Sequence, residues 1–382
     1  MLNKTLTLSD LIFFGITSIL GSGGFNLIGD AVAKAGPMFP ITLLTSGALF
    51  LGSASSYSYA NDTYKSNISE TKLIESALGS SGKMLSIVSI LLYNIFAIAT
   101  MIVVCSKVLF PNESFFHQIS FSLLLLGLMT LLALQKLSIS KTIINTLSIC
   151  IVALLSYISY LGLQKVSSTE ALFPKTNMYE SFLFFIFVLA GHDALIKFTE
   201  ETVDQKDVDK SFYISIVISI LLTASVSFAA YLYIHDFKKG NLENILADIF
   251  TAATGKNGTF ITCISLVFMV VTTFIGFLGT TRYIYDLPEY FPSLTFIKDG
   301  GKDSVSMLTI VLTSILCGFV LCINHVSSLV EFTDIGLIIT LLLVAISSFI
   351  EKYKKGDISI IDMATSGGFM GVLGMVVKKH FF

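Results

Sequence analysis

The sequence Gly21-Ser22-Gly23-Gly24 interrupts the first apolar run of the chain, which extends from residue 10 to 33. A run of this length predicts a membrane helix, because about 20 apolar residues cross the hydrocarbon core of a bilayer. Each glycine weakens a helix by roughly 1 kcal/mol relative to alanine. Unpaired backbone at membrane depth is tolerated only where it faces protein or a watery cavity. The stretch therefore predicts a broken membrane helix beside a binding cavity, or else a close contact between helices.

A second interruption lies in the apolar run 179–198, where Gly191 is followed directly by His192 and Asp193. An aspartate at the centre of a membrane helix costs about 2.5–3.5 kcal/mol on insertion scales, so it usually faces a cavity, a partner or an ion. We expect Asp193 to bind an ammonium group of a ligand and His192 to titrate during the working cycle. The alternative is a buried His–Asp pair that satisfies itself, or a pair close to the inner water.

The composition places the whole chain in a membrane. Of 382 residues, 54% are hydrophobic and only 13% are charged, whereas soluble domains carry roughly 25% charged residues. The net charge of −2 gives no sign of a nucleic-acid partner. Apolar stretches of about 20 residues predict an all-α integral membrane protein with about eleven transmembrane helices. The expected spans are 10–33, 38–60, 83–110, 119–135, 141–163, 179–198, 211–235, 259–283, 304–324, 328–350 and 359–377.

The spacing of these spans predicts one transmembrane domain over residues 1–377, built from two repeats. Five spans fill residues 10–163 and five fill 179–350, with an extra helix at 359–377. In each group a long loop separates the second span from the third, and we expect short amphipathic helices within these loops at 70–78 and 242–253. Because five is odd, the second repeat must be inverted relative to the first, which is characteristic of secondary transporters.

Lysine placement predicts the orientation of the chain in the lipid bilayer. A cytoplasmic N-terminus puts most loop lysines, Lys197 among them, and the single arginine, Arg282, on the cytoplasmic side. This agrees with the excess of basic residues expected in cytoplasmic loops. The sequence does not indicate an oligomeric state.

Several stretches resemble the amino acid–polyamine–organocation (APC) superfamily of transporters. Gly21 to Phe25, then Gly29 and Ala35-Gly36-Pro37, is similar to that family's first-helix signature, and Phe187 to Gly191 followed by Glu200-Glu201 is similar to its sixth-helix pattern. The resemblance implies a leucine-transporter-type five-plus-five fold with broken helices 1 and 6.

The resemblance also implies roles for individual residues. Amides near Gly21, Ser22, Gly23 and Gly24 would bind a carboxylate. Carbonyls near Phe187, Val188 and Ala190, beside Gly191, would bind an amine. Phe187 would be the aromatic gate over the substrate, and Glu200 and Glu201 would act in closure at the cytoplasmic end. These residues of the two breaks, together with His192 and Asp193, form the predicted substrate site.

The predicted function is secondary transport of an amino acid or a polyamine-like amine by alternating access. The coupling ion would be H⁺ or Na⁺, and no other cofactor is expected. Thr280 and Thr281, with Thr272-Thr273, are candidate sodium ligands, although threonines often bond their own helix backbone. Uniport or exchange is favoured over proton symport, because the lysine that some proton-coupled relatives carry in helix 5 is missing. The alternative is a transporter-like sensor or accessory protein that binds without transport. No catalytic or metal motif indicates an enzyme.

Overall fold

The computed structural model describes residues 2–23, 27–111, 113–135, 137–164, 177–237, 244–299 and 304–381. These residues are almost entirely helical, and their only β-type pairing is an isolated parallel bridge between Leu6 and Thr202. Nine helical segments of the described chain are long and apolar enough to cross a membrane, and shorter apolar helices occupy Leu8–Gly21 and Met307–Leu321. Together they account for the eleven predicted spans.

The first repeat contains the first broken helix. Its elements are α1 (Leu8–Gly23), α2 (Ile28–Ala35), η1 (Gly36–Met38), α3 (Phe39–Tyr64), α4 (Ser69–Leu109), α5 (Phe115–Ala133) and α6 (Leu137–Leu163). The first predicted span is divided into α1 and α2, as its glycines indicate. Gly24 lies outside the described residues. The predicted loop helix at 70–78 forms the first part of α4, up to a kink at Gly79, where φ is 71°.

The second repeat contains the second broken helix. Its elements are α7 (Met178–Leu189), η2 (His192–Glu201), α8 (Lys206–Phe237), α9 (Ile245–Thr254), α10 (Thr259–Asp286), η3 (Leu287–Glu289), η4 (Pro292–Lys298), α11 (Met307–Leu321) and α12 (Val326–Lys355). The predicted loop helix at 242–253 corresponds to α9. The extra helix is α13 (Ile360–Phe381), which packs on α3 and α12.

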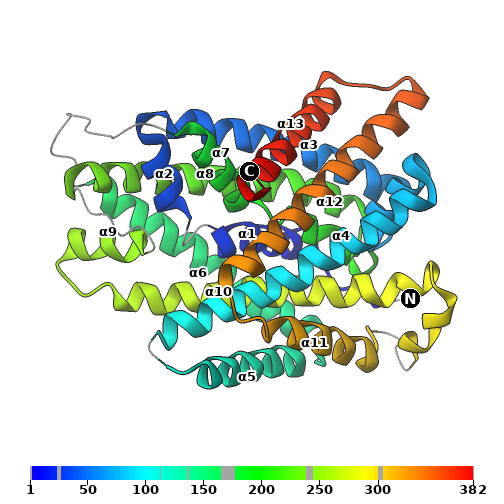
Figure 1. Ribbon diagram of the computed structural model, residues 1–382, viewed down its shortest axis with the longest axis horizontal. Coiled ribbons are helices and arrows are strands. Elements are labelled where there is room, and N and C mark those ends of the chain that lie inside the picture. Colours follow the sequence, from blue (N-terminus) through cyan, green and yellow to red (C-terminus); the bar gives the residue numbers. More distant parts are fainter. Residues whose placement is uncertain are drawn as a thin grey trace.

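The packing of the helices follows the inverted repeat. Helix α1 packs on α8, while its counterpart α7 packs on α3; likewise α6 packs on α8, while α12 packs on α3. In Figure 1, α1 lies near the middle of the bundle, α4 and α12 run alongside each other across the front, and α5 and α11 lie together at one edge. The broken helices are therefore surrounded by both repeats.

Candidate functional site

The break in the second repeat rests directly on the first broken helix. Helix α7 ends at Leu189, Ala190 is extended, and Gly191 has a φ of 118° before η2 begins. A side chain at Gly191 would place its Cβ 2.6 Å from the carbonyl oxygen of Ser18 in α1. Only glycine combines this backbone conformation with so close an approach. The second break is thus held in contact with helix α1.

Helix α1 is held against α10 by a second close approach. A Cβ at Gly21 would lie 1.5 Å from the hydroxyl oxygen of Thr272, and that hydroxyl donates a 2.8 Å hydrogen bond to the carbonyl oxygen of Thr17. Gly21 is buried. Gly21 therefore allows a close contact between helices, which was the alternative interpretation of the glycine-rich stretch. This contact lies at the break.

A cavity of about 1280 Å³ borders both broken helices and extends to the C-terminal end of α4. Its inner part is lined by Ser18, Tyr93, Phe187 and Gly191, and its far part by residues that include Lys107. We call the end of the bundle that this cavity reaches the open end. Much of the wall between these two parts is apolar, with side chains from four helices: Ile98 and Met101 of α4, Phe184 of α7, Met269 of α10 and Leu337 of α12.

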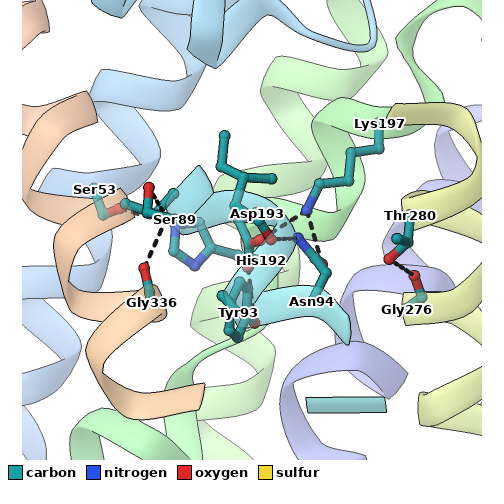
Figure 2. Close-up of polar contacts among 12 residues, drawn as sticks. Ser53, Ser89, Tyr93, Asn94, His192, Asp193, Lys197, Gly276, Thr280 and Gly336 are labelled. Carbon is teal, nitrogen blue, oxygen red and sulfur yellow. Dashed lines mark hydrogen bonds and ion pairs between the residues drawn. The ribbon is translucent and has the colours of Figure 1, made fainter. Parts of the chain in front are cut away.

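Asp193 lies on the floor of this cavity and is paired with a lysine. Its Oδ2 is 3.1 Å from Nζ of Lys197, and the Tyr93 hydroxyl donates to its Oδ1 over 3.4 Å. Lys197 Nζ also donates to Oδ1 of Asn94 at 3.2 Å (Figure 2). Lys197 is only 1% exposed and belongs to η2, so it lies inside the bundle and not in a loop. Asp193 and Lys197 are four residues apart, a spacing that brings side chains together on an α-helix, and here the pair forms on the 3₁₀ helix η2.

His192 faces away from the cavity. Its Nε2 is 2.9 Å from the hydroxyl of Ser53, and its ring packs edge-on against Phe50, Tyr57 and Phe212. Figure 2 shows this ring beside Ser53, away from the Lys197 ammonium. The side chain is fully buried and is not among the residues that line the cavity. His192 and Asp193 therefore do not form a self-satisfying pair.

The other end of the bundle is sealed by polar contacts around the end of η2. Glu201 forms an ion pair with Arg282, whose Nη1 also donates to the carbonyl oxygen of Leu278 at 2.8 Å. The backbone N–H of Glu200 donates to Asn67, which in turn donates to Asp286 at 2.9 Å. We call this the closed end. It also holds the Leu6–Thr202 bridge near the N-terminus.

The remaining predicted site residues are distributed as follows. Phe187 is half-buried in the cavity wall, Ala190 lines the cavity, and Val188 is buried but is not among the lining residues. Ser22 and Gly23 form the end of α1.

The threonines that were candidate sodium ligands donate hydrogen bonds to backbone carbonyls. Thr280 donates to Gly276 at 2.7 Å and Thr281 to Leu278 at 2.7 Å. Within the described residues, no cluster of three or more His, Cys, Asp or Glu side chains could hold a metal ion.

Two inverted repeats, with a cavity at their broken helices that extends to the open end, define a secondary transporter. The sequence matches the family described as amino acid permease over residues 6–377, and the chain belongs to that family. The fold is similar to that of Mhp1, a nucleobase-cation-symport-1 family transporter, in a closed conformation with bromovinylhydantoin bound. The TM-score is 0.57 at 10% sequence identity, covering 99% of this chain and 94% of that one. A search of curated proteins finds no match to the sequence.

Proposed function

We propose that this transporter carries an amino acid, or a closely related amine, in the cavity between the two breaks. The single observation that carries the proposal is the cavity itself, which is bounded by Ser18 of one broken helix and by Phe187, Ala190 and Gly191 of the other. Membership of the amino acid permease family supports the substrate class.

The broken helices offer partners for both ends of a zwitterion. The last carbonyls of α7, near Phe187 to Ala190, have no further turn of α-helix to bond, and the negative end of the helix dipole favours an ammonium there. The amides after Gly21 and Ser22, toward the start of α2 at Ile28, would take the carboxylate.

The ion pair between Asp193 and Lys197 narrows the range of proposed substrates. Lys197 already neutralises this carboxylate, so Asp193 has less attraction for a second cation than a lone aspartate would have. The wall formed by Ile98, Met101, Phe184, Met269 and Leu337 offers apolar contacts instead. We therefore favour a neutral amino acid with an apolar side chain over a cationic one or a polyamine.

The proposed orientation has the N-terminus in the cytoplasm. The loop and helix ends at the closed end carry Lys65, Lys72, Lys206 and Lys298, in agreement with the basic excess expected on the cytoplasmic side. The open end then faces outside, and Glu200 and Glu201 belong to the cytoplasmic gate. Phe187, on the open side of the break, is proposed as the outer gate.

Counterflow in proteoliposomes tests the proposal directly. Purified protein is reconstituted, vesicles are preloaded with one unlabelled compound, and uptake of the same labelled compound is followed for a panel of amino acids, polyamines and a hydantoin. Accelerated uptake of a neutral apolar amino acid is the expected result. Exchange of the hydantoin alone would contradict the substrate class. Thermal stabilisation by an amino acid without any exchange would favour a sensor.

Two glycine-to-alanine variants, one at the break and one away from it, provide a test and a matched control for this assay. Gly191→Ala forces a side chain into a left-handed conformation and toward the Ser18 carbonyl, and we expect exchange to fall by about tenfold or more. Gly127→Ala in α5 meets nothing within 4 Å and should exchange like the unmodified protein. Equal activity of both variants would show that the break is not part of the site.

A further inference from the structure

The extra helix, α13, reaches the open end of the cavity although it belongs to neither repeat. It begins at Ile360, just after the C-terminal end of α12, and Lys378 near its other end is one of the residues that line the cavity. In Figure 1, α13 runs from the edge of the bundle toward its middle, where its C-terminal end lies near α7. The contacts of α13 along its length show what it holds together.

The start of α13 is fixed to α12 by a buried ion pair. The carboxylate of Asp362 lies 2.6 Å from Nζ of Lys352, and their side chains are only 2% and 12% exposed. Asp362 also accepts hydrogen bonds from the backbone N–H and the hydroxyl of Ser359, at 3.1 and 2.8 Å. Separating a buried pair of this kind is costly, because each charge would lose its partner. This end of α13 therefore stays with α12, a helix that lines the cavity through Leu337.

The middle of α13 packs closely on α3. A side chain at Gly368 would place its Cβ 2.6 Å from Cδ1 of Leu49, so the two helices are in direct contact. The fully buried ring of Phe369 meets the ring of Phe50 edge-on, with the centroids 6.3 Å apart. Phe50 in turn packs edge-on against His192 at the second break. The extra helix thus packs against the wall behind that break.

The far part of α13 is hydrogen-bonded to α7, the open-end half of the second broken helix. The hydroxyl of Tyr179, in the first turn of α7, donates to the carbonyl oxygen of Met375 at 2.7 Å. The next residue, Glu180, forms an ion pair at 2.5 Å with Lys34 of α2, the open-end half of the first broken helix. Tyr179 and Glu180 both line the cavity. The Tyr179 hydroxyl therefore connects α13 to the paired open-end halves of both broken helices.

We propose that α13 is a brace that ties α7 to α12 and favours the conformation in which the open end is open. This inference rests on the proposed function of a carrier, in which the open end has to close during each cycle. Closure moves α7 relative to α12, since both helices line the cavity. Because α13 is fixed to α12, this movement breaks the bond between Tyr179 and Met375. A hydrogen bond that is made in one state only shifts the ratio of the two states by about fivefold.

A distance between α7 and α12 at the open end measures this ratio directly. One spin label is attached at Met178→Cys, which is partly exposed at the start of α7, and one at the native Cys322, just before α12. The other exposed cysteines are removed by Cys150→Ala and Cys263→Ala. Pulsed electron paramagnetic resonance in lipid nanodiscs, without substrate, then gives the populations with the longer and the shorter distance.

Tyr179→Phe keeps the ring and removes the donated hydrogen bond. We expect it to shift the ratio of populations by about fivefold toward the shorter distance. Tyr353→Phe removes an exposed hydroxyl in the last turn of α12, and this control should leave the ratio unchanged. If Tyr179→Phe fails to fold, Asp362→Asn weakens the other attachment of α13 and should shift the ratio in the same direction.

The outcomes separate the brace from a bond that is only structural. An unchanged ratio overturns the proposal, even if the thermal unfolding midpoint of Tyr179→Phe is lower, and a shift toward the longer distance overturns it as well. The distances are measured without substrate, so they do not depend on which compound is carried. Failure of every compound to exchange in the counterflow assay contradicts the proposed function, whereas an unchanged ratio in a protein that exchanges substrate contradicts the brace alone.

Discussion

Two buried ion pairs involve the same short helix, η2, but their surroundings differ. Glu201 and Arg282 meet at the closed end through two guanidinium nitrogens, with a third contact to a backbone carbonyl. Asp193 and Lys197 meet at the cavity floor through a single contact, and the same ammonium also donates to Asn94. A pair held at several points suits a fixed seal, whereas a pair joined by one contact beside a cavity separates more readily.

The chemistry of the two cations reinforces the contrast. Arginine stays charged in proteins and its planar group fits a carboxylate at two points, whereas lysine is a flexible point charge whose protonation is readily perturbed by burial. The seal therefore uses the residue that keeps its charge. The cavity floor uses the residue that can change partners.

The largest expected effect comes from removing half of the seal. Arg282→Gln leaves Glu201 buried without a cation, which typically destabilises a protein by about 3–5 kcal/mol. We expect a lower thermal unfolding midpoint and loss of exchange. The double variant Arg282→Gln with Glu201→Gln removes both charges and should recover much of the stability. A double variant as unstable as the single one would show that packing, and not charge, dominates.

A smaller loss is expected at the cavity floor. Lys197→Gln also removes a cation, but Asp193 borders the cavity, where water can solvate its charge. We expect a loss of about 2 kcal/mol in stability. Lys72→Gln breaks a partly exposed pair with Glu289 and should cost about 1 kcal/mol or less. If Lys197→Gln lowers the stability more than Arg282→Gln does, the comparison of the two ion pairs is wrong.

The smallest expected effect concerns His192, the residue beside Asp193. Ser53→Ala removes the hydroxyl that bonds His192 and should cost about 1 kcal/mol. Since His192 does not line the cavity, the substrate concentration for half-maximal exchange should stay unchanged. Thr63→Ala, in the same helix, removes an exposed hydroxyl bonded to its own backbone and serves as the control. A shift in substrate affinity for Ser53→Ala alone would connect His192 to the site.

Sequence reasoning located both breaks but not the partners of the charged groups near them. His192 and Asp193 are adjacent, and adjacent residues of a helix point in different directions. Asp193 therefore reaches the cavity and Lys197, while His192 packs among aromatic rings. Lys197 was assigned to a loop because the apolar run ends near residue 198, and hydropathy does not show whether a lysine at a span's end turns inward or outward.

The sequence by itself determined the membrane class, the eleven spans, the two broken helices and the family, because hydropathy and the backbone preferences of glycine are local properties of the chain. Only the tertiary structure decided that Tyr93 and Asn94 meet the Asp193–Lys197 pair, that Glu70 is buried and that the cavity reaches the open end. The first of these features joins residues from η2 and α4 that are at least 100 positions apart. Their contacts depend on how the helices turn and pack, which no local pattern specifies.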